Sequence, residues 1–285
     1  MTHAEPSPCV PATPPGAPPA RPRRSARELA RSSAGLALGS AALSIAVFAF
    51  AAIGFRQGWI GFAAATRGLT GIAVPALALL AVLFGLLAAL LALTAKPRGG
   101  AVAPLVAAVL GLGVFLFWTQ ANARNERAPP VHDVATDWTD PLMFSPKVVA
   151  ARGERANPVE LAPVVPEGPR APGGFIGRPV ADVNARTCLG AVPVVLTTTP
   201  ADAYAKLKAA VTGERMAVLT DDPAAGRIEA TVARGFWGVR DDLAGRVRPE
   251  GAGARVDLRS IARAGETDDG ANCDRITRLR KALAG

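Results

Sequence analysis

Three long segments without a charged side chain constrain this chain more than any other feature. Residues 32–55, 68–95 and 99–123 contain no Asp, Glu, Lys or Arg. Each is longer than the roughly 20 residues with which an α-helix crosses about 30 Å of hydrocarbon. Buried core helices are a poor alternative, because three in succession would each have to be uncharged over their whole length. The sequence therefore predicts a three-helix transmembrane region with the lipid bilayer as a partner.

Basic residues at the ends of these segments predict their orientation. Cytoplasmic loops carry an excess of Lys and Arg. Five arginines precede the first segment, two lie in the loop after it, and a tight basic turn, Lys96 to Arg98, joins the second to the third. We expect a multi-pass protein of the cell (inner) membrane with a cytoplasmic N-terminus. Three spans then place the C-terminal domain outside the cytoplasm, in the periplasm of a bacterium with two membranes.

The net charge of +9 does not indicate a nucleic-acid partner. Residues 1–121 hold nine basic and two acidic residues, whereas residues 122–285 hold 23 and 21. The excess therefore lies beside the apolar segments, and the rest of the chain lacks a basic footprint. With one Tyr and two Trp after residue 121, a base-stacking platform is not expected either.

Proline content and residue alternation divide the chain further. Residues 1–31 are expected to form a disordered, Pro-rich, basic cytoplasmic tail, and residues 124–180 a Pro-rich arm with little regular structure. We expect this arm to pack across the domain through four apolar side chains. These are Val131, Val134, Leu142 and Phe144.

Residues 181–285 show the pattern of a compact α+β domain. Strands are expected at 192–196, 216–219, 227–234, 243–248 and 255–261. Helices are expected from Pro200 to about residue 211, after a Thr199 N-cap, and at about 269–284. Consecutive strands favour antiparallel pairing, and two apolar-faced helices can cover one sheet face. The predicted fold is a two-layer α+β sandwich with an antiparallel sheet, for which a helix-grip-like arrangement is the specific variant.

One face of this sheet is predicted to be densely charged, and further polar residues follow it in sequence. The candidate residues for binding a ligand or partner are Glu229, Asp242, Arg246, Arg248, Asp257, Arg259, Arg263, Asp269, Asn272 and Arg275. Two interpretations remain open. The face is either a set of solvated ion pairs that contribute little to stability, or a polar groove whose guanidinium groups bind an anionic ligand or the carboxylates of a membrane or envelope protein.

Two classes of function follow from these residues. Because we find no glycine-rich phosphate loop, nucleophile–base pair or metal-ligand spacing, the first hypothesis is a non-catalytic binding or assembly module without a cofactor. The alternative is a hydrolase that uses Asp241, Asp242 or Asp257 as a general base, with His132 or a divalent cation. Neighbouring strand residues point to opposite faces, which makes Asp241 and Asp242 a poor pair. His132, Asp133 and Asp137 are weak metal candidates, because they have no recognised ligand spacing.

Two cysteines, Cys188 and Cys273, lie in the domain expected outside the cytoplasm. An oxidising compartment permits a disulfide bond between them. Alternatively, Cys273 is a buried thiol on the apolar face of the last helix. Both states are compatible with the sequence.

Several ordered sequence blocks resemble the domain of unknown function 1499 family. They are Ile228-Glu229-Ala230-Thr231, Asp241-Asp242, Arg246-Val247-Arg248, Val256-Asp257-Leu258-Arg259-Ser260 and Asp269-Gly270-Ala271-Asn272. The opening Pro-Pro-x-His-Asp with Thr136-Asp137 is similar to the family's first signature, so the resemblance covers roughly residues 128–284. It implies a domain of unsettled biochemistry that often follows membrane spans. Members of the family often have a Tyr-Pro pair in the early region of the domain. This chain departs from that pattern and has Thr187 to Gly190 near that place.

Overall fold

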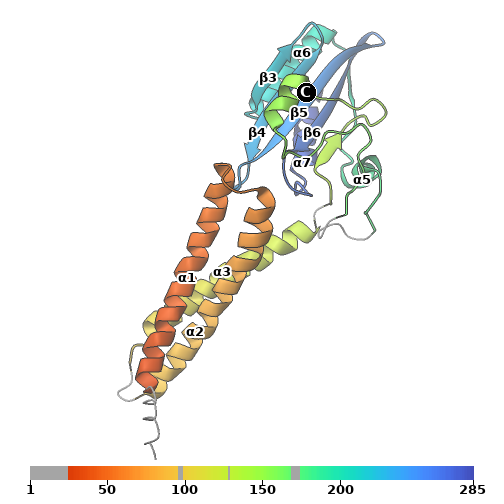
Figure 1. The fold of residues 1–285 in the computed structure, drawn as a ribbon. Coiled ribbons are helices and arrows are strands. Elements are labelled where there is room, and N and C mark those ends of the chain that lie inside the picture. The colour runs from red at the N-terminus through yellow and green to blue at the C-terminus, as the bar shows by residue number, and fades with distance from the viewer. Residues whose placement is uncertain (1–24, 96–98, 128, 168–173) are drawn as a thin grey trace, which may run out of the picture.

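The computed structural model describes residues 25–95, 99–127, 129–167 and 174–285 (Figure 1). Most of the expected Pro-rich tail and the basic turn at 96–98 lie outside these residues. The N-terminal half contains α1 (Ala26–Arg56), the π-helix η1 (Ala64–Ala73) that continues into α2 (Val74–Thr94), and α3 (Val102–Arg127). All three are long and apolar enough to cross a bilayer. The prediction of three membrane helices is confirmed.

The first helix begins earlier than its apolar segment. Ser25 caps it by accepting a hydrogen bond from the backbone of Glu28, whose side chain accepts one from Ser25 in return. This reciprocal capping satisfies two backbone donors at the helix start. Residues 26–31, expected to belong to the disordered tail, therefore form the first turns of α1.

Small residues bring α2 and α3 together. A Cβ atom on Gly85 would lie 2.6 Å from the carbonyl oxygen of Pro104, and one on Gly111 would lie 2.6 Å from that of Ala78. Such close backbone approach is typical of helix packing in membranes. α3 runs at an angle to α1 and α2 (Figure 1).

The C-terminal half is built on a six-stranded antiparallel sheet. Its strands are β1 (Asp133–Ala135), β2 (Val194–Leu196), β3 (Ala217–Asp222), β4 (Arg227–Arg234), β5 (Val239–Glu250) and β6 (Gly253–Ala262). The order is β1-β6-β5-β4-β3, and β2 pairs with β6 on the same edge as β1. Val134 lies opposite Ser260 and Val195 opposite Arg255, so β1 and β2 follow one another along β6.

Helices α6 (Pro200–Gly213) and α7 (Ala271–Ala284) cover one face of the sheet. Leu207 of α6 and Ile276 of α7 pack against Ile228 and Leu258 in the main core. As the sequence predicts, Thr199 caps α6 and Pro200 opens it. The two-layer α+β arrangement with an antiparallel sheet is confirmed.

The Pro-rich segment covers the opposite face. Leu142, Phe144 and Val148 pack against Ala244 and Ile261 of the sheet. The predicted burial of Val131, Val134, Leu142 and Phe144 is confirmed. The expectation of little regular structure is wrong in part, since this segment contains β1, α4 (Pro146–Arg152) and the start of α5 (Val180–Thr187). Ser145 caps α4 and Pro146 occupies its first turn, so local capping overrides the high proline content.

Candidate functional site

The charged sheet face exists, but the arm buries its centre. Glu229, Asp242 and Arg259 project from β4, β5 and β6 toward the arm, and none of the three is exposed to solvent. Both interpretations drawn from the alternation therefore fail at the centre, because the ion pairs are neither solvated nor open to a ligand. The arm occupies the place that a ligand would need.

Each buried charge at this centre has partners on the arm. Arg259 binds Asp133 through two parallel hydrogen bonds of 3.0 and 2.6 Å, and it donates to the carbonyl oxygens of Leu142 and Glu160. Its guanidinium lies 5.2 Å from the ring centroid of Trp138. All of its N–H donors thus point at the arm, so Arg259 clamps the arm to the sheet.

Asp242 is held in the same way. Arg152 of α4 reaches one oxygen at 2.5 Å, and Arg263 reaches both oxygens at 2.8 and 2.7 Å. Glu229 accepts hydrogen bonds from the backbone and hydroxyl of Ser145. Burial acts to raise the pKa of Glu229, but the hydrogen bonds from Ser145 and from Arg227 outweigh it and hold the pKa below its usual value.

The remaining candidates lie elsewhere. Arg275 faces the helix-covered side of the sheet, where it pairs with Asp241 at 2.8 Å. Asn272 is buried there as well and bonds Ser260 and the backbone of His132. Asp269 lies in the loop before α7, on the surface. The structure therefore does not bring the ten predicted residues together into one contact surface.

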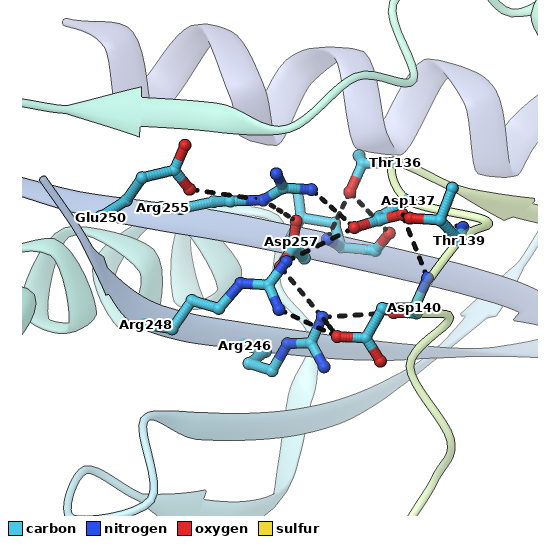
Figure 2. A network of polar contacts seen from close by, with 10 residues as sticks. Thr136, Asp137, Thr139, Asp140, Arg246, Arg248, Glu250, Arg255 and Asp257 are labelled. Carbon is cyan, nitrogen blue, oxygen red and sulfur yellow. Dashed lines mark hydrogen bonds and ion pairs between the residues drawn. The ribbon is translucent and has the colours of Figure 1, made fainter.

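A part-exposed cluster at the far end of β5 and β6 is what remains accessible of the charged face (Figure 2). This rim network consists of Asp137, Asp140, Arg246, Arg248, Glu250, Arg255 and Asp257. Asp257 is buried at its centre and pairs with all three arginines, at 3.1, 3.2 and 2.8 Å. Asp140 is exposed and pairs with Arg246 and Arg248, both at 2.9 Å.

The rim network offers no surplus positive charge to an anion. Its three guanidinium groups face four carboxylates, and every arginine has at least two of them as partners. Hydrogen bonds from Arg246 and Arg248 hold the pKa of Asp140 below its usual value, so that this carboxyl stays ionised. An anionic ligand would have to displace existing ion pairs. The network instead fixes Asp137 and Asp140 of the arm onto the sheet.

The carboxylates of the alternative hydrolase hypothesis are not arranged for catalysis. Asp241 and Asp242 point to opposite faces and are fully buried, each between two arginines. His132 is part-buried with its Nδ1 shielded from solvent, and desolvation lowers its pKa, which Asp133 opposes. Asp133 is bound to Arg259, and Asp137 to Arg255. Across the described residues no three His, Cys, Asp or Glu side chains gather as metal ligands.

A disulfide bond joins Cys188, which follows α5, to Cys273 of α7. Cys188 is buried in the main core, and Cys273 packs against it. The bond links the end of α5 to the last helix across 85 residues of sequence.

A cavity of about 590 Å³ lies where the membrane helices meet the domain, a place that no sequence motif indicated. We call it the juxtamembrane cavity. Its membrane side is lined by Ile45 and Phe48 of α1, Thr70 of η1 and Val114 of α3, and its domain side by the β4–β5 turn and residues 265–269. The π-helical η1 lies against it, and such wide turns occur often at functional sites. Most of the lining surface is apolar.

An aromatic turn of the domain reaches the membrane helices at this cavity. Phe236 and Trp237 lie between β4 and β5, and Phe236 stacks on Phe48 of α1 at 5.4 Å between ring centroids. Trp237 meets the same ring at 6.1 Å, and Phe117 of α3 meets it edge-on at 6.3 Å. The pair of large aromatics within a hairpin turn, between Gly235 and Gly238, is the one sequence signal that could have pointed here.

Comparison with known proteins identifies the domain but not its activity. A family model described as a protein of unknown function (DUF1499) matches residues 133–283. No curated protein and no solved structure gives a significant match. The match covers the sheet, both covering helices and almost all of the arm.

Proposed function

The chain belongs to the DUF1499 family of proteins of unknown function, and we propose that it is a membrane-anchored extracytoplasmic binding module whose ligand is a membrane lipid. One observation carries the proposal. The juxtamembrane cavity is apolar, measures about 590 Å³ and is lined from both the membrane helices and the domain. Small-molecule sites in proteins are mostly apolar cavities of roughly 300–1,000 Å³ with a few polar groups.

The depth of the cavity favours a lipid chain as its occupant. Phe48 lies eight residues before the last residue of α1, and Ile45 eleven residues before it. At about 1.5 Å per residue, these side chains lie roughly 12–16 Å down the helix. The membrane helices bury no more than a third of their most apolar windows inside the protein, so they face lipid over most of their surface. A lipid chain in the bilayer therefore lies beside the helices that line the cavity.

The location outside the cytoplasm rests on the distribution of basic residues. Arg27 and Arg31 lie in the first turns of α1, and further arginines precede them in sequence. By the positive-inside rule the N-terminus is cytoplasmic and the domain after α3 is extracytoplasmic, as in a bacterial inner-membrane protein with a periplasmic domain. A reporter fused after Gly285 is expected to be active when it requires export and inactive when it requires the cytosol. The reverse pattern would refute this orientation.

The charged sheet face gives less support to the other functions considered. A protein partner or an anionic ligand at that face would meet arginines that already bind the chain's own carboxylates. No observation favours the hydrolase, because its three carboxylates are each held by arginines. The arm and its ion pairs are better explained as the support that holds the domain, and hence the cavity, in shape.

The test fills the cavity and leaves the helices unchanged. Gly113 lines the cavity, and a Cβ atom there would meet nothing within 4 Å, so Gly113→Phe places a ring in the space without a backbone clash. Gly39→Phe is the matched control, because Gly39 is exposed on α1 and equally free of neighbours. The full chain is reconstituted in vesicles that contain a phospholipid with a photoreactive acyl chain.

We expect labelling of the lining segments, residues 45–48 and 234–239, in the unaltered chain and in Gly39→Phe, and a loss of that labelling in Gly113→Phe. Labelling of the outer helix surfaces should be the same in all three proteins. Equal labelling of the lining segments in both variants would refute lipid binding in the cavity, as would their absence from the labelled peptides of the unaltered chain.

A further inference from the structure

The polar end of the juxtamembrane cavity indicates which headgroup the lipid carries. Four ionisable or strongly polar side chains of the domain line it: Arg234, Glu266, Thr267 and Asp269. Thr267 is held by a hydrogen bond from its hydroxyl to the carbonyl oxygen of Pro129, and it accepts one from the backbone of Asp269. These bonds hold the loop in place and occupy the Thr267 hydroxyl. The charged groups are therefore left to select the ligand.

The cation that lines this end already has a carboxylate partner. Arg234 pairs with the buried Asp241, with its Nε 2.9 Å from Oδ2 and 3.0 Å from Oδ1. Asp241 in turn holds Arg275 on its other side. Arg234 therefore shares one carboxylate with a second guanidinium, and its Nε is not available to a headgroup.

The two carboxylates that line this end are less well satisfied. Glu266 pairs with Arg67 through one oxygen, while its other oxygen, Oε2, is buried without a hydrogen-bond partner. Within the described part of the chain, no hydrogen bond or ion pair reaches the side chain of Asp269. Oε2 of Glu266 is a buried acceptor without a donor, which costs free energy, whereas the carboxylate of Asp269 is exposed and open to a ligand. The complement of this end is a cation that carries N–H groups.

We infer that the cavity selects a phospholipid with a primary ammonium headgroup, such as phosphatidylethanolamine, through Glu266 and Asp269. This inference rests on the proposed lipid-binding function. A primary ammonium offers three N–H donors, so it can satisfy Oε2 of Glu266 and the carboxylate of Asp269 together. A trimethylammonium group has the same charge but no donor. Arg67 keeps about half of its side chain exposed beside Glu266, which leaves guanidinium donors for the adjoining lipid phosphate.

The experiment separates charge from hydrogen bonding. The full chain is reconstituted in vesicles that contain equal amounts of phosphatidylethanolamine, its N-methyl and N,N-dimethyl derivatives, phosphatidylcholine and phosphatidylglycerol, all with the same acyl chains. It is then extracted in mild detergent, and the retained lipids are quantified by mass spectrometry. We expect about tenfold enrichment of phosphatidylethanolamine over phosphatidylcholine, as for the loss of a charge-assisted hydrogen bond. Retention should fall as N–H groups are replaced by methyl groups.

Two substitutions test the residues. Glu266→Gln and Asp269→Asn should each reduce the preference for phosphatidylethanolamine, while the total amount of retained lipid changes little. Asp269→Asn is the cleaner variant, because its side chain holds no other group of the described chain in place and its backbone bond to Thr267 persists. Equal retention of phosphatidylethanolamine and phosphatidylcholine, a preference for phosphatidylglycerol, or an unchanged preference in both variants would overturn the headgroup inference.

The controls keep the two proposals distinguishable. Gly113→Phe should reduce all lipids alike, because it blocks the apolar part of the cavity. Lipid that is retained without headgroup preference, and lost in Gly113→Phe, would refute selection by Glu266 and Asp269 and support lipid binding. If the unaltered chain retains no lipid above the level of Gly113→Phe, both proposals fail.

Discussion

Arg259 on β6 and Asp133 on β1 form a two-point ion pair that is closed to solvent, with Nε and Nη2 of the guanidinium at 3.0 and 2.6 Å from the two carboxylate oxygens. The same guanidinium donates to two carbonyl oxygens of the arm, which lie about 100 residues or more before it in sequence. The pair therefore joins the start of the domain to its last strand. It shows that the most buried charges of the sheet serve to hold the arm.

The first prediction concerns this pair. Arg259→Ala should lower the free energy of unfolding by about 3–5 kcal/mol, because it leaves Asp133 buried without its partner. That is a large part of the roughly 5–15 kcal/mol that stabilises a typical domain. Urea titration of the full chain in detergent, followed by hydrogen exchange of the β6 amides, measures the loss.

Arg255→Ala is the matched control for Arg259→Ala. Arg255 is part-exposed. When its side chain is removed, Asp257 keeps Arg246 and Arg248 as partners. We expect a loss of about 0–1 kcal/mol, as for exposed ion pairs. If Arg259→Ala were no more destabilising than this control, the arm would not be clamped by the buried pair.

The second prediction is a pH dependence that involves His132. Burial lowers its pKa below the usual 6.5, so the folded state binds fewer protons than the unfolded chain once the pH falls below about 6.5. Stability must then decrease on acidification, by up to about 1.4 kcal/mol per pH unit for one proton, until the pH reaches the folded pKa. Urea midpoints between neutral and mildly acidic pH measure the slope.

A variant isolates the histidine from the carboxylates. His132→Phe removes the titrating ring and keeps a planar side chain in this part-buried position. We expect a flatter stability profile between pH of about 6.5 and 5, while the loss at lower pH, where the carboxylates protonate, remains. An unchanged slope in the variant would show that another group titrates in this range.

The third prediction concerns the bond between Cys188 and Cys273. Because it closes 85 residues of chain, the chain-entropy relation gives about 4–5 kcal/mol of stabilisation. The double variant Cys188→Ala/Cys273→Ala should unfold at clearly lower urea concentration than Cys9→Ala, which serves as control. A thiol count on the denatured, unreduced Cys9→Ala chain checks the bond itself, and two free thiols would exclude it.

The sequence predicted those elements whose signals are local. Thr199 and Pro200 start α6 as their residue types require, and the alternation from Arg227 to Arg234 matches β4 residue for residue. Ser145 and Pro146 give the same kind of signal at the start of α4, although the high proline content around them argues against a helix. Helix starts depend on the first two or three residues, and overall composition is a weaker guide.

What covers a sheet face cannot be obtained from alternation. Glu229 and Asp242 alternate with apolar residues just as solvent-exposed residues would, yet the arm buries both. The partners that bury them, Ser145 and Arg152, lie more than 80 residues away in sequence. The juxtamembrane cavity is harder still to foresee, because five separate segments line it and none of them carries a recognisable motif.

The fourth prediction concerns the aromatic turn. Phe236 and Trp237 meet Phe48 of α1, and neither belongs to the core clusters of the domain. Aromatic pairs of this kind contribute roughly 0.5–1.5 kcal/mol each beyond their burial. Phe236→Ser/Trp237→Ser should therefore release the turn from the membrane helices without unfolding the sheet.

Hydrogen exchange of residues 234–239 in the reconstituted full chain measures this release. Exchange there should rise severalfold in the double variant, while exchange of β6 stays unchanged. Trp59→Ser is the control, because Trp59 is exposed near the end of α1 and lies outside the ring pairs formed by Phe48. Because the turn also lines the cavity, the double variant should retain less lipid as well. Faster exchange with undiminished lipid retention would show that the cavity binds its ligand through the membrane helices alone.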